Sequence, residues 1–454
     1  MLNIKRMAWE LELKKRGNAL KCKRLLERWQ WKSASEVAVH QQRRLASLLR
    51  HAYQHVPYYR ETLPGSGVID RSGVVDLERF ANIPLLDKNI IKAEYDRLKS
   101  DDLPKRSWFV ESSGGSTGMP VNIVQDRDFV DWSDAVKMMD DEWSGLIVGN
   151  RRAYVWGSVR DTLVGKETLR TQVGRWLRNE LWLNSFRMSE ERMEQFVHQI
   201  NDHRPVQIIA FAENLFDLAN FIEARGLKAY SPKAIMTSAG VLYPHMRDKI
   251  QQVFRAPVFN RYGSREVGDI ACECECHNGL HISSFTHFVE ILREDGSSAA
   301  PGEYGEIVIT LLTNYAMPLL RYRIGDLGVM SEETCACGRG MPLLKDVIGR
   351  TTDIFINCRG ERIDGRMFIR MLMLKPFIRK FQVVQEQYDK VRIRLEPQGE
   401  HPDLYQLYAG ELGELQRETV AIMGGRCEVD FEFTEQIETT PSGKYRFTIS
   451  NVHK

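Results

Sequence analysis

The sequence lacks long apolar runs, low-complexity tracts and internal repeats. No stretch of its 454 residues approaches eighteen consecutive apolar residues, which excludes a membrane-spanning helix. Residues 1–17 contain no apolar core with a small-residue cleavage site, so we expect no secretion signal. The formal charge is only +2, which argues against nucleic acid as the main partner. Hydrophobic residues make up 43% and charged residues 27%, a balance that predicts a soluble, cytoplasmic protein of two or three domains.

Positive charge is nevertheless concentrated at the N-terminus. Residues 1–32 hold ten Lys or Arg against three Glu, interleaved with Trp9, Trp29 and Trp31. A basic amphipathic helix of this kind can lie on an anionic membrane surface, which would place the protein at the inner face of a membrane. The alternative, which we favour because basic helices are common, is a solvated helix packed on the body of the protein. We treat residues 1–35 as a separate basic helical segment.

The middle of the chain alternates strand-like and helix-like segments. A buried strand over 206–211 precedes a helix over 213–226, and the pattern repeats with a strand at 233–240, a helix at 243–254 and a strand at 256–263. Such alternation predicts the α/β class, with mixed or parallel sheets flanked by helices.

The later segments follow a different pattern. Segments 288–295, 305–312 and 327–331 are strand-like without intervening helices, which predicts antiparallel strands or a β-barrel-like subdomain. Strands then restart with a helix near 365–374, so we expect a small α+β domain over 354–454.

A loop rich in Gly, Ser and Thr spans residues 112–120, with the sequence SSGGSTGMP, between two strand-like segments. Glycine lets the backbone adopt positive φ and approach a ligand closely, while amides and hydroxyls point at one anion. No Lys follows the last Gly and no helix pattern begins there, so this is not a Walker loop. A phosphate site and an ordinary surface hairpin turn both fit the loop taken alone.

The same loop resembles the phosphate loop of the adenylate-forming superfamily, which includes acyl-CoA synthetases, luciferases and peptide-synthetase adenylation domains. Four further segments resemble motifs of that superfamily in the right order, and the nearest branch is the phenylacetate–CoA ligase group, especially members associated with capsular polysaccharide biosynthesis. These segments are RYGSREVG (261–268), RYRIGDLG (321–328), IGRTTDIF followed by RGERI (348–363), and TPSGKYRF (440–447).

The resemblance implies a domain plan and roles for particular residues. A large domain (36–348) would be joined by a hinge (349–353) to a mobile small domain (354–454). Glu266 would hold Mg²⁺ and take part in catalysis. Arg350 would donate to the ribose or the α-phosphate as a second catalytic residue.

Two further roles concern the ribose and the acid. Asp326 would accept hydrogen bonds from the ribose hydroxyls. Lys444, on a loop of the small domain, would bridge the substrate carboxylate to the phosphate. The remaining ATP-binding residues implied by the resemblance are Ser113, Gly114, Gly115, Ser116, Thr117 and Gly118 around the phosphates, and Ser238, Ala239, Gly240, Arg261, Tyr262, Gly263 and Ser264 around the adenine.

The chain departs from the family pattern at three places. Met119 stands where many relatives have Lys, so one positive charge near the phosphates is missing. Arg265 stands where relatives often have Thr. The hinge contains 351–353, Thr-Thr-Asp, where many relatives have two acidic residues.

Five of the eight cysteines fall in two groups, 272–276 and 335–337. Without a secretion signal we expect a reducing compartment, where metal binding is a better interpretation than disulfides. Relatives in this branch often have a Cys seven residues before the His of a GLHI segment, which here is residues 279–282. This resemblance points to Cys274 and His281, and with the later cysteines it implies one structural Zn²⁺ site. Cys276 in place of Cys274, and free thiols with no metal, remain alternatives. The expected ligands are Cys274, His281, Cys335 and Cys337.

We therefore expect an AMP-forming acid–thiol ligase. It would convert a carboxylic acid and ATP to an acyl-adenylate and pyrophosphate, and then transfer the acyl group to coenzyme A. Transfer to an amine of a surface-polysaccharide precursor is an alternative, and an inactive nucleotide-binding scaffold is another. Phe211, Phe216 and Phe259 could line the acid pocket or belong to the core, and we favour the core.

Overall fold

The computed structural model describes residues 2–112, 121–157, 169–185, 188–293, 295–350, 354–373, 375–398, 403–435, 437 and 447–452. The chain divides into two units, Met1–Gly349 and Arg350–Lys454. In the described parts of both units, no helix is long and apolar enough to cross a membrane.

The first unit begins with four helices. These are α1 (Leu2–Arg16), α2 (Ala19–Trp29), α3 (Ala34–His55) and α4 (Pro57–Ser66). Ser33 begins α3 with a reciprocal capping box to Glu36. Val56 separates α3 from α4 because a residue before proline avoids the helical conformation, and Pro57 then starts the next helix.

The basic N-terminal segment packs on the body of its unit, as the favoured interpretation expected. Cys22 and Leu26 of α2 are buried against Ala135 and Met139 of α6 (Arg127–Trp143). The backbone N–H of Asn18, between α1 and α2, donates to Asp131 over 2.7 Å. The buried side chains of α2 are therefore used for packing on α6.

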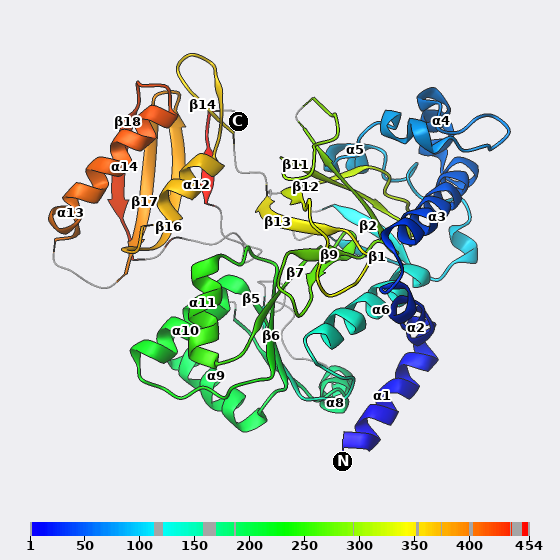
Figure 1. The fold of residues 1–454 in the computed structure, drawn as a ribbon, viewed down its shortest axis with the longest axis horizontal. Coiled ribbons are helices and arrows are strands. Elements are labelled where there is room, and N and C mark those ends of the chain that lie inside the picture. Colours follow the sequence, from blue (N-terminus) through cyan, green and yellow to red (C-terminus); the bar gives the residue numbers. More distant parts are fainter. Residues whose placement is uncertain are drawn as a thin grey trace. The chain divides into compact units, whose positions relative to one another are not determined.

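A single eleven-stranded sheet forms the centre of the unit (Figure 1). Within the sheet, the strands that come first along the chain are parallel, and the later ones are antiparallel. Its strand order is β10-β11-β12-β13-β9-β8-β7-β6-β5-β3-β4. Buried apolar runs account for the central strands, since strands covered on both faces need apolar residues at successive positions. The parallel half comprises β3 (Arg152–Val155), β4 (Glu180–Leu183), β5 (Gln207–Phe211), β6 (Ala234–Ser238) and β7 (Val258–Ser264), connected through α8 (Leu169–Leu177), α9 (Glu190–His203), α10 (Ala212–Ala224) and α11 (Pro244–Phe254).

The antiparallel half continues the same hydrogen-bonded sheet. Strand β7 is the transition, parallel to β6 on one side and antiparallel to β8 on the other. The antiparallel strands that the sequence predicted as barrel-like thus extend the parallel ones. They are β8 (Gly268–Glu273), β9 (Leu280–Ile282), β10 (His287–Leu292), β11 (Tyr304–Leu311), β12 (Tyr322–Met330) and β13 (Leu343–Arg350).

A two-stranded hairpin and short helices complete this unit. Strands β1 (Trp108–Ser112) and β2 (Asn122–Asp126) pair antiparallel on either side of the glycine-rich loop. Preceding them are the 3₁₀ helix η1 (Leu77–Asn82), α5 (Lys88–Ala93) and the 3₁₀ helix η2 (Leu103–Lys105).

The second unit is a small α+β domain with its own core. Its four-stranded sheet has the order β18-β17-β16-β19, and helices α12 and α14 contact strands β16 and β18, respectively. Phe355, Phe368 and Leu415 are fully buried in its core with the apolar side of the sheet. The elements are β14 (Ile354–Ile356), β15 (Arg362–Asp364), α12 (Arg366–Met373), β16 (Ile378–Gln387), β17 (Lys390–Pro397), α13 (Leu404–Leu407), α14 (Ala409–Ile422), β18 (Glu428–Phe433) and β19 (Thr448–Ser450). The predicted fold class is confirmed.

Candidate active site and candidate metal centre

The carboxyl ends of the parallel strands bring two predicted adenine-binding segments together. Thr237 of β6 pairs with Asn260 of β7, so residues 238–240 follow one strand beside residues 261–264 of the other. Ligands of open α/β sheets bind at this edge of the strands. Ala239 has φ +65°, a conformation that non-glycine residues seldom adopt and that is enriched at functional sites.

Gly240 lies against the carboxylate of Glu213, the second residue of α10. A Cβ at Gly240 would come within 2.1 Å of a Glu213 carboxylate oxygen, so any larger side chain would displace that group. Gly240 thus lets the Glu213 carboxylate lie directly against the backbone here.

Tyr262 and Asp326 join two of the predicted motifs. The hydroxyl of Tyr262, on β7, donates a hydrogen bond of 2.8 Å to Asp326 Oδ2, on β12. The two residues are 64 positions apart, and both are half-buried. Because an ionised carboxylate can accept up to about four hydrogen bonds, this contact can orient Asp326 while it accepts further donors.

Glu266 is buried on the turn between β7 and β8 and faces a lysine. Lys88 Nζ lies 3.6 Å from Glu266 Oε1. The segment before α5 brings Lys88 there because Leu86 pairs with Tyr322 at the start of β12. The side-chain amide of Gln125 donates to the carbonyl of Arg265 over 3.0 Å and ties the turn to β2. Nothing in the sequence distinguished Lys88 or Gln125 from other polar residues.

The side chain of Arg261 lies among buried acids. Its guanidinium is 3.6 Å from Asp269 and 3.9 Å from Asp141, and Asp140 is buried nearby. Burial raises the pKa of Asp140 well above its usual range, with the Asp269 charge adding to the shift. The charge of Arg261 is therefore used among these buried acids.

Two predicted parts of the site, one ATP-binding and one catalytic, lie outside the described residues. They are the phosphate-loop residues 113–118 and Lys444. The backbone of Arg350 ends β13, and its side chain is not among those described.

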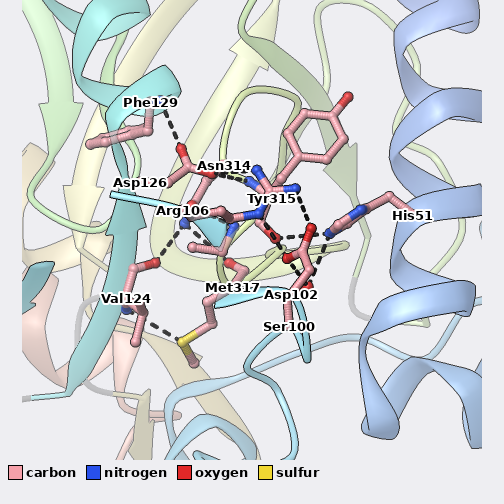
Figure 2. Close-up of polar contacts among 11 residues, drawn as sticks. His51, Ser100, Asp102, Arg106, Val124, Asp126, Phe129, Asn314, Tyr315 and Met317 are labelled. Carbon is pink, nitrogen blue, oxygen red and sulfur yellow. Dashed lines mark hydrogen bonds and ion pairs between the residues drawn. The ribbon is translucent and has the colours of Figure 1, made fainter. Parts of the chain in front are cut away.

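The base of the hairpin that carries the glycine-rich loop is held by a polar network (Figure 2). Arg106 donates to both carboxylate oxygens of Asp102 at 2.8 Å and to Asp126 at 3.3 Å. Asp126 ends β2, caps α6 through the N–H of Phe129, and also accepts from the N–H of Tyr315. These contacts join β1, β2, α6 and the β11–β12 connection.

Other members of Figure 2 extend this network. His51 of α3 contacts the carbonyl of Tyr315 at 2.9 Å, and Ser100 donates to Asp102 at 2.7 Å. The side-chain amide of Asn314 donates to the carbonyl of Val124 in β2. Hydrogen bonding from Arg106 holds the pKa of Asp102 well below its usual range, so this carboxylate stays ionised. The hairpin is thus anchored by charge at the end opposite its loop.

The four predicted zinc ligands come together. Their ligand atoms all lie within 4.8 Å of one another, with 3.6 Å between the sulfurs of Cys274 and Cys335 and 3.2 Å between Cys337 Sγ and His281 Nε2. Donors of a tetrahedral zinc site, with bonds of about 2.0–2.3 Å, are roughly 3.5–3.8 Å apart. Except for the half-buried Cys337, the ligand residues are buried. The donor set therefore fits zinc.

The surroundings of these ligands also suit a metal. His281 Nδ1 lies 3.3 Å from the carbonyl of Met341, which leaves Nε2 as the ligand atom. Burial lowers the pKa of His281 to about 4, which favours the neutral form that binds metals. The N–H groups of Cys276 and Arg339 donate to the sulfurs of Cys274 and Cys337. Cys276 itself is exposed and His277 contacts Glu273, so neither joins this cluster.

The three candidate acid-pocket phenylalanines separate into two groups. Phe216 and Phe259 are buried among apolar side chains, as the core interpretation predicted. Phe211, at the end of β5, is half-buried with its ring 4.1 Å from that of Trp156. Phe211 and Trp156 are therefore two half-buried aromatic residues at the carboxyl edge.

Comparison with known proteins finds relatives along most of the chain. Residues 355–451 match the family model of the CapK C-terminal domain. The chain is 23% identical to Protein CapK of Staphylococcus aureus over 418 residues, covering 91% of this chain and 89% of that protein. It is 27% identical to a phenylacetate-coenzyme A ligase of Thermus thermophilus over 363 residues, covering 76% and 77%. The resemblance predicted from the motifs is confirmed.

Solved structures show the same fold. A 2-hydroxyisobutyryl-CoA ligase in the postadenylation state matches with a TM-score of 0.71 at 19% identity, covering 94% of this chain and 92% of that chain. An amide bond synthetase from Marinactinospora thermotolerans matches with a TM-score of 0.51 at 17% identity, covering 74% and 66%. Both ligases share the architecture described above.

Proposed function

We propose that this chain, which belongs with the adenylate-forming ligases as a homologue of the phenylacetate-coenzyme A ligases and Protein CapK, activates a carboxylic acid with ATP. The acid and ATP give an acyl-adenylate and pyrophosphate, and the acyl group then passes to an acceptor with release of AMP. The proposed acceptor is the thiol of coenzyme A.

The hydrogen bond between Tyr262 and Asp326 is the observation that best supports this proposal. It links a motif on β7 with a motif on β12, beside residues 238–240 at the carboxyl edge of the parallel strands. An oriented carboxylate suits the two hydroxyls of a ribose, and the adjacent strand ends offer backbone groups to a flat base. The site thus has an acceptor for ribose where a nucleotide would be expected.

The reaction brings two anions together, so positive charge must offset their repulsion. Glu266 is the residue proposed to hold Mg²⁺, which prefers one or two carboxylates together with phosphate oxygens. Lys88 lies close to Glu266 and is positioned to neutralise phosphate charge when the carboxylate binds a cation. Lys444 is proposed to bridge the substrate carboxylate and the α-phosphate.

The zinc proposal is structural. Three thiolates and one imidazole fill a tetrahedral site and leave no position for a reacting water, so the ion would stabilise the fold without entering the reaction. Cys274 and His281 lie on the β8–β9 side, while Cys335 and Cys337 precede β13. Zinc would therefore join the segment after Glu266 to the strand that ends at Arg350.

A pyrophosphate-release screen with purified protein tests the activation step. Aryl, fatty and amino acids are supplied with ATP and Mg²⁺, and Lys444→Ala is compared with Lys228→Ala, an exposed lysine outside the site. We expect Lys444→Ala to lower acid-dependent pyrophosphate release about a hundredfold or more, and Lys228→Ala to match the parent. Equal rates in the two variants would remove Lys444 from the chemistry.

Product analysis then identifies the acceptor. The accepted acid is supplied with ATP and either coenzyme A or an amino sugar, and the product is identified by mass. A coenzyme A thioester supports the proposal, whereas an amide formed in preference would assign the chain to amide synthesis.

A further inference from the structure

Helices α1 and α8 are fixed side by side at one edge of the first unit (Figure 1). Lys5 of α1 donates to the carbonyl of Trp176 at 3.0 Å and to Asn179 at 2.7 Å, and its ammonium lies 4.2 Å from the centre of the Trp176 ring. The side chain of Asn179 in turn donates to the carbonyl of Gly149 over 2.7 Å. Helix α1 is therefore held beside α8 in a defined position.

The inner side of α1 is packed. Leu13 is buried with Met138 of α6, and Trp9 and Val148 pack on the same cluster. This packing determines which side chains of α1 face the solvent.

Each of the two helices exposes large apolar side chains. Met7 and Leu11, one helical turn apart on α1, are 60% and 54% exposed. Val173 and Trp176 of α8 are 54% and 64% exposed. We call these four residues the α1–α8 patch. Burying them against another apolar phase would be favourable, since each removes large apolar area from water.

Positive charge accompanies this patch. Lys14 and Lys15 are exposed on α1 and make no ion pair within the described parts of the chain. The neighbouring Glu10 is paired with Arg6, and Glu12 has a partner of its own. Lys23 and Lys32 are paired with Glu142 and Glu36, so among the residues that the structure describes the positive charge left unpaired beside the patch is that of Lys14 and Lys15.

We infer that the α1–α8 patch and its two lysines form a docking surface for an anionic lipid bilayer. Interfacial helices of this kind insert aliphatic and aromatic side chains at the headgroup level and set basic residues against acidic lipids. Tryptophan is enriched at this depth because its ring is apolar with one polar edge. A nucleic-acid partner would use the charges, but Met7, Leu11 and Val173 would gain little from phosphates. This inference does not depend on the proposed reaction.

Vesicle sedimentation with the full chain tests the inference. The vesicles are phosphatidylcholine alone or phosphatidylcholine mixed with phosphatidylglycerol. We expect binding to the mixed vesicles, weakened by salt, and little binding to the neutral ones. The double variant Lys14→Gln/Lys15→Gln should bind about thirtyfold more weakly, because each lysine near an anionic surface contributes about 1 kcal/mol. Met7→Ser/Leu11→Ser should bind about tenfold more weakly through lost apolar insertion.

Matched variants elsewhere on the unit serve as controls. Val74→Ser removes a side chain that is 63% exposed, and Lys105→Gln/Lys228→Gln removes two exposed charges. Both should bind like the parent protein, and all variants should retain parental thermal unfolding. No binding to mixed vesicles, or equal loss in test and control variants, would overturn the inference. The inference would also be overturned if an RNA or an acidic polypeptide bound the protein as tightly as the mixed vesicles do and Met7→Ser/Leu11→Ser left that affinity unchanged.

Discussion

The contact between Tyr262 and Asp326 predicts a specific coupling in ATP binding. Changing Tyr262 to Phe removes only the hydroxyl that donates 2.8 Å to Asp326 and keeps the ring on β7. Hydrogen bonds to charged groups contribute about 1.5–3 kcal/mol, and the lower end applies because both side chains are half exposed. If the bond orients Asp326 toward the ribose, losing it should weaken ATP binding by about 1.4 kcal/mol, or about tenfold.

A double-mutant cycle separates this orientation from other roles of Tyr262. ATP affinity is measured by calorimetry for the parent, Tyr262→Phe, Asp326→Ala and the double variant, with Tyr58→Phe as a control for hydroxyl loss on α4. Asp326→Ala should weaken ATP binding because two ribose hydroxyls lose their acceptor. In that background Tyr262→Phe should have almost no further effect, so the coupling should equal the effect in the parent, about 1.4 kcal/mol. Equal effects of Tyr262→Phe in both backgrounds would refute the reasoning.

Three further predictions concern the metal, the hairpin base and pH. Protein purified without chelators should contain one zinc per chain by elemental analysis, and Cys337→Ser should lose zinc and thermal stability together. Less than about a tenth of an equivalent would return these residues to free thiols. Arg106→Met should lower the free energy of unfolding by about 3 kcal/mol, because it removes three charge-assisted hydrogen bonds to Asp102 and Asp126. An unchanged denaturant midpoint would contradict the anchoring role. Burial lowers the pKa of His287 to about 4, below its unfolded value of about 6.5. The neutral form therefore stabilises the folded state fully above about pH 6.5. As the pH falls toward 4, the free energy of unfolding should drop by about 3 kcal/mol. The unfolding free energy of His287→Gln should therefore fall less between neutral and acidic pH than that of the parent. If the two proteins show the same pH dependence, His287 does not cause it.

Local sequence patterns predicted much of the fold. The apolar segment 206–211 forms β5 over Gln207–Phe211, and the predicted helix at 243–254 forms α11 over Pro244–Phe254. These predictions rest on the spacing of apolar residues along the chain, which depends only on whether a segment is a helix or a strand. The glycine-rich loop and the order of the motifs pointed to the family in the same way, because each motif is contiguous.

Pairing between distant segments needed the tertiary structure. The order of strands placed β13 beside β9, and this brings Cys335 and Cys337 to Cys274 and His281 across about 60 residues. The sequence proposed those four ligands from their types and the family resemblance, but their mutual distances depend on strand register. Phe216 and Phe259 could not be distinguished from Phe211 for a similar reason, since exposure at the end of a strand depends on what packs over it.

By itself the sequence determined the fold class and the family, and it predicted the residues of a nucleotide site. The tertiary structure alone decided that Tyr262 orients Asp326, that Lys88 faces Glu266 and that Arg106 anchors the glycine-rich hairpin. It also decided which basic and apolar residues of α1 remain exposed beside α8. The physical reason is that secondary structure follows local periodicity, whereas a hydrogen bond or an exposed patch depends on the packing of segments that are distant in the chain.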